Sequence, residues 1–265
     1  MDIRAHNRDA WDREVLSGDN PWTLPVIPEA VARARQGDWA VLLTENKAVP
    51  RDWFPAFPAD VLCLASGGGQ QGPILAAAGA RITVFDNSPA QLAQDRLVAE
   101  REGLSIRLVE GDAADLSVFD SASFDLVFNP CSTVFMPDVR PVWREAARVL
   151  RPGGILMTGA MNPLYYIFDL DRMDAGILEV SHPVPYADSR DLPPSRLEDF
   201  MSQRLPLEFG HSLTDLLGGQ LEAGFHITHL YEDVKNDSPL ARYHPAYIAT
   251  RAIKTPHPPH PGDAP

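Results

Sequence analysis

The sequence predicts an α/β protein with a doubly wound, mostly parallel sheet of seven strands. Three observations lead to this fold class. Short apolar segments alternate with helical segments between residues 61 and 158. A glycine-rich run at residues 67–72 directly follows the first apolar segment. Two further apolar segments, residues 225–231 and 246–253, are close enough in sequence to pair antiparallel, so we expect the last strand of the sheet to be antiparallel.

The first 58 residues are expected to form an N-terminal helical extension that caps the sheet. Residues 5–16 and 28–35 have helical patterns, and the second begins with a proline, which suits a first helical turn. Most tryptophans of this extension are expected to pack onto the core. Trp11, with Asn7 on the same helix face, is the predicted exception that contacts a bound ligand.

Residues 59–160 are expected to form the ligand-binding core. Pro73 opens a helix after the glycine run, and Ser88-Pro89-Ala90-Gln91 has the pattern of a capped helix start. That helix should end at Gly103, and a further helix is expected over residues 139–150. The expected parallel strands cover residues 61–64, 81–85, 106–109, 124–128 and 155–158.

The rest of the chain is less regular. Residues 161–211 are rich in Pro, Tyr, Asp and His and are expected to form an irregular insert on the substrate side. A helix then runs from Ser212 to about Gly224, before the two closing strands. The tail at residues 255–265 is expected to be disordered, which leaves a single domain over residues 1–254.

Charge and composition limit the classes of partner. The chain has 23 basic and 36 acidic residues, a net charge of −13, which disfavours nucleic acid and anionic membranes. There is no apolar run of membrane-spanning length, the first residues lack the apolar core of a signal peptide, and two cysteines imply no disulfide framework. We therefore expect a cytoplasmic protein with a small-molecule substrate; the sequence indicates no particular oligomeric state.

Several polar residues fall at the predicted carboxyl ends of strands, where doubly wound sheets bind ligands. They are the glycine run, Asp86, Asp112 and Asn129. The run fits G-x-G-x-x-G and Asp86 follows on the next strand, which taken alone fits NAD. The match is weak, because other cofactors also carry an adenosine whose ribose would use the same carboxylate.

The order of several short motifs resembles the class I S-adenosylmethionine-dependent methyltransferases, especially the small-molecule branch that includes the ubiquinone and menaquinone methyltransferases. The resemblance spans residues 61–160, and the opening His6-Asn7-Arg8-Asp9-Ala10-Trp11-Asp12 is similar to N-terminal helices of bacterial relatives. The motifs are the glycine run, Asp86-Asn87-Ser88-Pro89, Glu110-Gly111-Asp112-Ala113, Phe124-Asp125-Leu126-Val127 and Leu150-Arg151-Pro152-Gly153-Gly154.

This resemblance implies a Rossmann-like methyltransferase fold, S-adenosyl-L-methionine as cofactor, and roles for individual residues. Asp86 would accept hydrogen bonds from the ribose hydroxyls, and Asp112 would bond the adenine amino group. Asn129 would face the methionine amino group and the sulfonium. With Asn7 and Trp11 included, the expected cofactor contacts are Asn7, Trp11, Ala65, Gly67, Gly69, Gln70, Gln71, Asp86, Asn87, Gln91, Asp112, Ala113 and Asn129.

The chain departs from the family pattern at two positions in the first strand region. Cys63 stands where the family usually has an acid, and Ala65 stands where it usually has glycine. A contact routed through that acid is therefore expected to be absent or replaced.

The acceptor is expected beyond the fifth strand, lined by Met161, Asn162, Tyr165 and Tyr166. Transfer would be an in-line displacement, and a general base is needed only if the acceptor arrives protonated. The candidate bases are His182, His211 and Tyr165, and no metal is expected. Two alternatives remain open: an NAD-dependent oxidoreductase, and a non-catalytic S-adenosylmethionine-binding protein, which the departures at Cys63 and Ala65 would suit.

Overall fold

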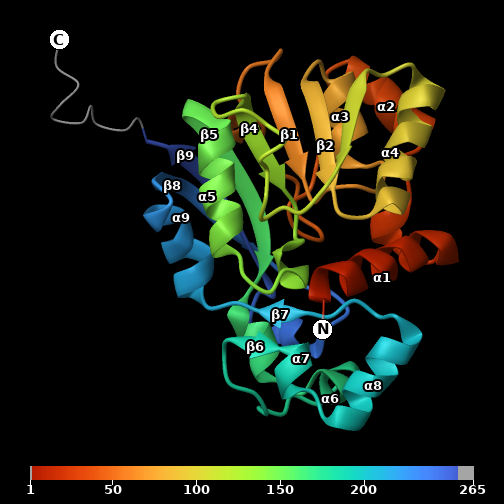
Figure 1. Ribbon diagram of the computed structural model, residues 1–265, viewed down its shortest axis with the longest axis vertical. Helices are drawn as coiled ribbons and strands as arrows, with labels where there is room; N and C mark the ends of the chain where they lie inside the picture. Colours follow the sequence, from red (N-terminus) through yellow and green to blue (C-terminus); the bar gives the residue numbers. More distant parts are fainter. Residues whose placement is uncertain (1, 256–265) are drawn as a thin grey trace, which may run out of the picture.

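The computed structural model describes residues 2–255 and contains a seven-stranded sheet with helices on both faces (Figure 1). The strand order is β3-β2-β1-β4-β5-β9-β8; the first five strands pair in parallel, and β9 is antiparallel to both neighbours. The predicted fold class is therefore confirmed. The strands are β1 (Asp60–Leu64), β2 (Arg81–Asp86), β3 (Ile106–Glu110), β4 (Phe124–Asn129), β5 (Leu150–Met161), β8 (Phe225–Asp233) and β9 (Tyr247–Lys254).

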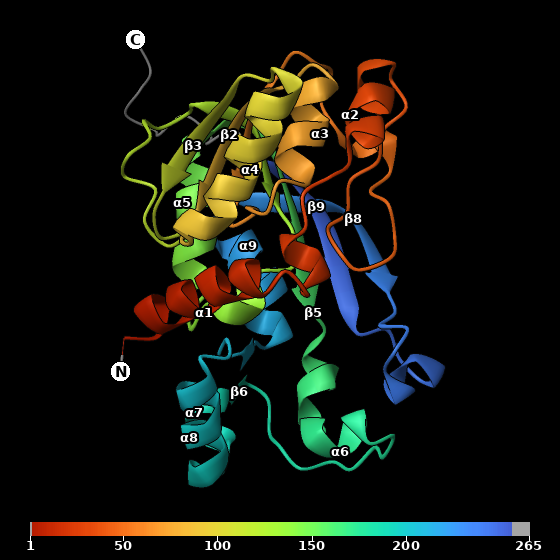
Figure 2. The ribbon, with the colours of Figure 1, turned by 90° about the vertical axis from the view of Figure 1, so that its right-hand side faces the viewer.

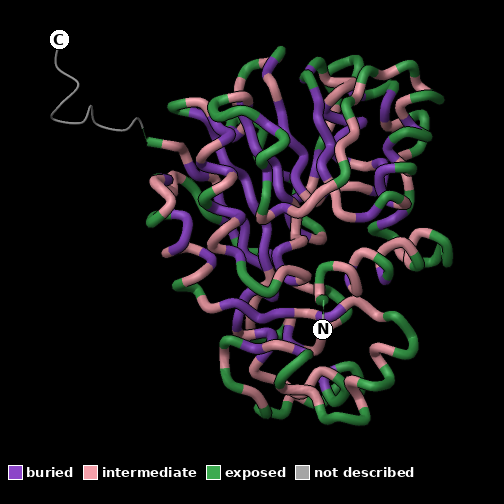
Figure 3. Tube along the Cα trace, in the orientation of Figure 1, coloured by how far each residue is buried: buried purple, intermediate pink, exposed green. Residues whose placement is uncertain are grey.

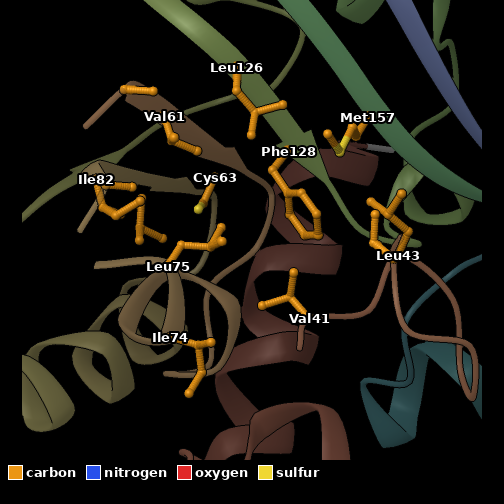
Figure 4. Close-up of a cluster of buried hydrophobic side chains, with 14 of the residues drawn as sticks. Val41, Leu43, Val61, Cys63, Ile74, Leu75, Ile82, Leu126, Phe128 and Met157 are labelled. Carbon is orange, nitrogen blue, oxygen red and sulfur yellow. The ribbon is translucent and has the colours of Figure 1, made fainter. Parts of the chain in front are cut away.

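Each face of the sheet has its own apolar core, and β1 contributes to both. Val61 and Cys63 face the core that lies under one helical layer (Figure 4), whereas Leu62 and Leu64 face the other. This alternation is the two-residue period of a strand buried on both faces. The first layer comprises α2 (Pro28–Arg35), α3 (Gln71–Ala77) and α4 (Pro89–Glu102); the second comprises α5 (Arg140–Val149), a π-helical turn (Thr214–Gly218) and α9 (Gly219–Glu222).

The helix signals of the core are confirmed in detail at α4. Ser88 precedes the helix, and its hydroxyl accepts a hydrogen bond from the Gln91 N–H at 3.0 Å. Gly103 ends the helix in the left-handed conformation, with φ of 65°. The first helix is likewise close to its prediction and forms α1 (Ile3–Ser17).

Two segments differ from the sequence expectation. Strand β5 begins at Leu150 and includes Arg151-Pro152-Gly153-Gly154, which the sequence predicted as a break; a register shift between Phe124 and Leu126 accommodates the irregular start. Residues 161–211 are also more regular than expected. They contain α6 (Leu170–Asp174), α7 (Asp188–Asp191), α8 (Pro194–Gln203) and a two-stranded sheet of β6 (Tyr186–Ala187) and β7 (Phe209–Gly210).

The insert lies below the carboxyl ends of the strands, and α1 passes between the two (Figures 1 and 2). Buried residues concentrate in the strands and continue into β7 and its surroundings (Figure 3). Tyr166, Met173 and Tyr186 of the insert belong to a third apolar cluster, which the insert shares with residues outside it such as Leu240 and Tyr247. Apart from Thr255, the predicted disordered tail lies outside the described residues, and over residues 2–255 no helix has the length and apolar character needed to cross a membrane.

Candidate functional site

A cavity of about 680 Å³ lies at the carboxyl ends of strands β1 to β5, between α1 and the insert. This is the edge of the sheet where doubly wound folds bind ligands. The predicted site residues in its wall are Asn7, Trp11, Ala65, Gly67, Gln70, Gln71, Asp86, Asn87, Gln91, Asp112, Ala113, Met161, Tyr165 and Tyr166. The described site residues that lie outside the wall are Gly69, Asn129, Asn162, His182 and His211.

The glycine run contributes to the cavity through Gly67, whose N–H donates to Asp86 Oδ2 at 2.8 Å. A Cβ at Gly67 would lie 2.6 Å from Gln91 Cβ, so no larger residue fits beside this carboxylate. Gly69 has a different role. Its φ is 72°, and the absent Cβ leaves room for the Gln94 carbonyl of α4. Gly67 therefore borders the cavity, and Gly69 lets the run pack against α4.

Asp86 presents a fixed carboxylate to the cavity. Besides the Gly67 N–H, it accepts the Ser88 N–H on Oδ1 at 2.9 Å. Burial raises the pKa of Asp86, while these main-chain hydrogen bonds oppose the rise. Nearby, Ser66 Oγ and Gln91 Oε1 are buried without a hydrogen-bond partner. A fixed carboxylate at the cavity wall suits a ligand that carries hydroxyl groups.

The start of α1 lies over the ends of β2 and β3. Asn87 Nδ2 donates to the Arg4 carbonyl at 3.1 Å, and Arg4 Nε donates to Asn87 Oδ1 at 3.3 Å. The Arg4 guanidinium is also 3.7 Å from Asp112, whose other oxygen accepts the Ala114 N–H at 2.9 Å. Asp112 is thus held at the cavity wall by its own turn and by a partly exposed cation.

Asn7 ties α1 to the far wall of the cavity. Its Nδ2 donates to the carbonyls of Phe135 and Leu207 at 2.9 and 3.0 Å, and its Oδ1 accepts the Leu207 N–H at 2.8 Å. The side chain is only 4% exposed. Trp11, one helical turn on, packs edge-on against the Phe135 ring at 4.9 Å between centroids. The Asn7 amide is therefore occupied by the main chain of segments far away in sequence.

Asn129 likewise uses its amide inside the protein. Its Nδ2 donates to the Leu64 carbonyl at 2.9 Å and to Ser132 Oγ at 2.8 Å, and its Oδ1 accepts the Thr158 hydroxyl at 2.9 Å. These contacts join the ends of β1, β4 and β5. Asn129 is fully buried beneath the cavity rather than in its wall.

The departures at Cys63 and Ala65 have structural counterparts. Cys63 is fully buried, and burial raises the pKa of its thiol. Ala65 has φ of 45°, in the left-handed region that glycine adopts with less steric strain than alanine. A buried carboxyl is still present beside Cys63, but it is Asp95 of α4; burial raises the pKa of Asp95 to about 8. Strand β1 therefore has no acid at this position, and the buried carboxyl group beside Cys63 comes from helix α4 instead.

The far end of the cavity contains charged residues that the sequence reasoning missed. The Tyr166 hydroxyl donates to Glu208 Oε2 at 2.8 Å. The Tyr247 hydroxyl donates to Glu45 Oε2 at 2.7 Å, and Lys235 lies 3.9 Å from the same oxygen. All five residues line the cavity. They come from four separate parts of the chain.

The ionisation of the Glu208 carboxyl group is strongly affected by its burial. Burial raises its pKa to about 7, and the charge of Asp188 adds to the rise, while Tyr166 and Lys235 oppose it. The one local signal was an acid within the apolar segment Leu205-Pro206-Leu207-Glu208-Phe209. That signal does not indicate which cavity the carboxylate faces.

The candidate histidines lie away from the cavity wall. His211 is 9% exposed and its Nε2 is 3.0 Å from the Thr133 carbonyl; burial lowers its pKa. The His182 ring lies beside Tyr186, with centroids 5.1 Å apart. Asn162 caps a short 3-10 turn. In the described part of the chain no three His, Cys, Asp or Glu side chains are arranged to hold a metal ion.

Comparison with known proteins identifies relatives of this chain. Residues 62–158 match the family model described as a methyltransferase domain. An uncharacterized methyltransferase of Bacillus subtilis (strain 168), YbaJ, is 49% identical over 251 residues, which cover 94% of this chain and 98% of that protein. A sterol 24-C-methyltransferase of Aspergillus fumigatus is 38% identical over 103 residues, 36% of this chain and 27% of the fungal protein.

Solved structures share the fold at low sequence identity. An S-adenosylmethionine-dependent methyltransferase from Mesorhizobium loti superposes with a TM-score of 0.59 at 19% identity, covering 77% of this chain and 94% of that one. A structure described as a putative S-adenosylmethionine-dependent methyltransferase from Listeria monocytogenes has a TM-score of 0.57 at 15% identity, covering 78% and 95%.

Proposed function

This chain belongs to the class I S-adenosylmethionine-dependent methyltransferases, and we propose that it methylates a small-molecule acceptor by in-line displacement. Its cofactor is S-adenosylmethionine, which when bound supplies a methyl group on a positively charged sulfur. The family assignment removes the NAD-dependent oxidoreductase that the glycine run alone allowed. It also makes the protein an enzyme rather than a non-catalytic binder.

One observation supports the proposal most strongly: a single cavity joins a polar wall at Asp86 to a tyrosine-lined wall at Tyr165 and Tyr166. The polar wall suits the nucleoside half of the cofactor. In this proposal Asp86 accepts hydrogen bonds from the ribose hydroxyls.

The other cofactor contacts follow from position in the wall. Asp112 and the Ala113 N–H would contact the adenine, beside Asn87, and Gln70 and Gln71 would contact the part nearer the glycine run. Gly69 and Asn129 would act indirectly, by shaping the run and by bracing the strand ends.

The size of the cavity and the charge of the chain favour a small acceptor. A volume of about 680 Å³ falls in the range of small-molecule sites, roughly 300–1,000 Å³. The net charge of −13 disfavours a nucleic-acid acceptor. Met161, Tyr165 and Tyr166 would form the acceptor wall, and α1 with the insert would exclude water while the acceptor is aligned with the methyl carbon. We propose that residues 1–254 work as one domain in this way.

Calorimetric titration with S-adenosylmethionine tests the cofactor site. Loss of hydrogen bonds to a carboxylate costs about 1.5–3 kcal/mol, so Asp86→Ala should weaken binding by about 10- to 100-fold. Asp125→Ala is the matched control, because Asp125 bonds the Asp60 N–H and Arg151 away from the cavity. Unchanged affinity in Asp86→Ala would reject the ribose assignment.

Asp86→Ala also removes the acceptor of the Gly67 and Ser88 N–H groups, so some loss of stability is expected. Asp86→Asn keeps the shape of the side chain and serves as the second variant. Activity is tested by incubating the protein with methyl-labelled cofactor and a small-molecule cell extract. Labelled product in the low-molecular-weight fraction supports the proposal; label only in protein or nucleic acid contradicts it.

A further inference from the structure

The two carboxylate oxygens of Glu208 have different surroundings: one is hydrogen-bonded to the protein, and the other faces the cavity. Oε2 accepts the Tyr166 hydroxyl at 2.8 Å. Within residues 2–255 no group donates a hydrogen bond to Oε1. Oε1 is also not fully buried, so it is accessible from the cavity that Glu208 lines. An accessible, unpartnered carboxylate oxygen beside an acceptor wall can accept a proton.

Both the main chain of Glu208 and its hydrogen-bond partner Tyr166 are held in place by neighbouring residues. Asp188 accepts the Glu208 N–H at 2.6 Å, and the Asp188 N–H donates back to the Glu208 carbonyl at 3.0 Å. The preceding residue, Leu207, is held by Asn7. The Tyr166 ring in turn stacks on Tyr186, with centroids 5.3 Å apart. Such fixation suits a group that must meet a reacting atom in one orientation.

The groups around Glu208 keep its pKa close to neutral pH. Asp188 of α7 and Asp174 of α6 disfavour its ionised form, and Tyr166 and Lys235 favour it. Two further neighbours, Tyr165 and Cys131, feel the charge of Glu208 from the same wall. The resulting pKa of Glu208, about 7, is near the value at which a carboxylate is an effective general base around neutral pH.

Other cavity groups are less suited to take a proton. Glu45 also accepts a tyrosine hydroxyl, from Tyr247, but in addition Lys235 forms an ion pair with it at 3.9 Å. Burial raises the pKa of Tyr165, which keeps its hydroxyl protonated. His182 and His211 do not line the cavity. Glu208 is the carboxylate that remains on the acceptor side.

We propose that Glu208 is the general base of the reaction and that the acceptor is an uncharged molecule methylated on a proton-bearing oxygen or nitrogen. This inference rests on the proposed methyltransferase function. A lone pair of the acceptor atom forms the bond to the methyl carbon, and the electron pair of the breaking carbon–sulfur bond stays on sulfur. The proton of the acceptor atom passes to the Glu208 carboxylate and leaves to solvent with the products. Tyr166 is a positioning residue that stabilises the ionised carboxylate.

The test uses the full chain, methyl-labelled S-adenosylmethionine and the small-molecule extract, with initial rates measured across pH. In the wild type the rate should rise with pH to a plateau above about 7, because Glu208 must be ionised. Glu208→Gln should lower the plateau rate by about 100-fold or more without changing the affinity for the cofactor. Tyr166→Phe removes a hydrogen bond to the ionised form, so the rising limb should move to higher pH.

Glu198→Gln, an exposed acid of α8 in the same insert, is the matched control and should leave the rate unchanged. The proposal is overturned if Glu208→Gln keeps the rate and pH profile of the wild type, or raises only KM. It is also overturned if the methyl group in the product is on an atom that carried no proton. A wild type that binds the cofactor but yields no labelled product would instead refute the proposed function, and this inference with it; that failure is visible without any variant.

Discussion

Replacing Asn7 by alanine tests how the cavity is closed. Asn7 is the link between α1, the 3-10 turn that ends at Phe135, and Leu207 beside β7. Alanine at this position removes three hydrogen bonds and leaves two carbonyls and one N–H without a partner. Alanine itself suits a helix, so the propensity of α1 is not reduced. The whole effect should therefore come from the lost link.

The size of the effect follows from burial. Leu207 is fully buried, so its N–H and carbonyl cannot be satisfied by water unless the segment moves, which costs about 1–3 kcal/mol. The Phe135 carbonyl borders the cavity and can be hydrated, so its share is smaller, about 0.5–1 kcal/mol. We expect Asn7→Ala to lower the free energy of unfolding by about 1.5–4 kcal/mol, a large part of the roughly 5–15 kcal/mol typical of a domain.

Urea denaturation followed by tryptophan fluorescence measures this loss, and hydrogen exchange locates it. Exchange should accelerate in residues 205–210 and in α1, with little change in the central strands. Asn236→Ala is the matched control, since that exposed amide makes one hydrogen bond, to Asn46. A loss below about 1 kcal/mol for Asn7→Ala, or faster exchange throughout the sheet, would refute the reasoning.

Three further predictions concern the supports of the cavity. Asp95 is fully buried with its pKa raised to about 8, against about 3.9 when unfolded, so the wild type should lose stability as pH rises through this window, by at most about 1.4 kcal/mol per pH unit. Asp95→Asn should flatten that dependence in urea titrations between about pH 5 and 8, and an unchanged slope would contradict it. A Cβ at Gly111 would overlap the buried Phe85 ring, so Gly111→Ala should cost about 1–3 kcal/mol of stability; a neutral result in thermal unfolding would mean that the ring can move aside. Asp233 accepts hydrogen bonds from the loop at residues 44–47, so Asp233→Ala should speed amide exchange in that loop, and protection equal to wild type would argue against the bracing role.

The strands and the polar residues at their carboxyl ends could be predicted because their signals are local. Ser88 and Gly103 delimit α4 within one segment. Gly67 lies three residues after β1 and Asp86 is the last residue of β2, and the ends of these neighbouring strands must meet at one edge of the sheet. The extended start of β5 was missed since Arg151-Pro152-Gly153-Gly154 has the composition of a turn. These four residues form an irregularity rather than an end of the strand: Leu150 pairs with Phe124, and the regular ladders with β4 and β9 begin at Ile155.

Polar residues near the site were harder to assign than the strands. Asn7 and Asn129 were both predicted to contact the cofactor because of where they lie on a helix face and at a strand end. The structure engages both amides with main-chain groups from distant segments. An asparagine amide has two donor hydrogens and one acceptor oxygen, so once these are used little remains for a ligand. Sequence position identifies which asparagines are near the site, but only the fold determines what their amides bind.

At the proposed acceptor end, Tyr165 and Tyr166 were predicted, but the charged residues Glu208 and Lys235 were missed for the same physical reason. The family model matches residues 62–158, which contain Asp86 and Asp112 but none of Tyr166, Glu208 and Lys235. The proposed acceptor wall is instead assembled from the insert and from loops joined by long-range contacts. Its residues can therefore change without disturbing the strand ends that hold the cofactor. Because shared cofactor chemistry imposes no acceptor, the proposed substrate preference has to be tested at Tyr166, Glu208 and Lys235 rather than at the strand ends.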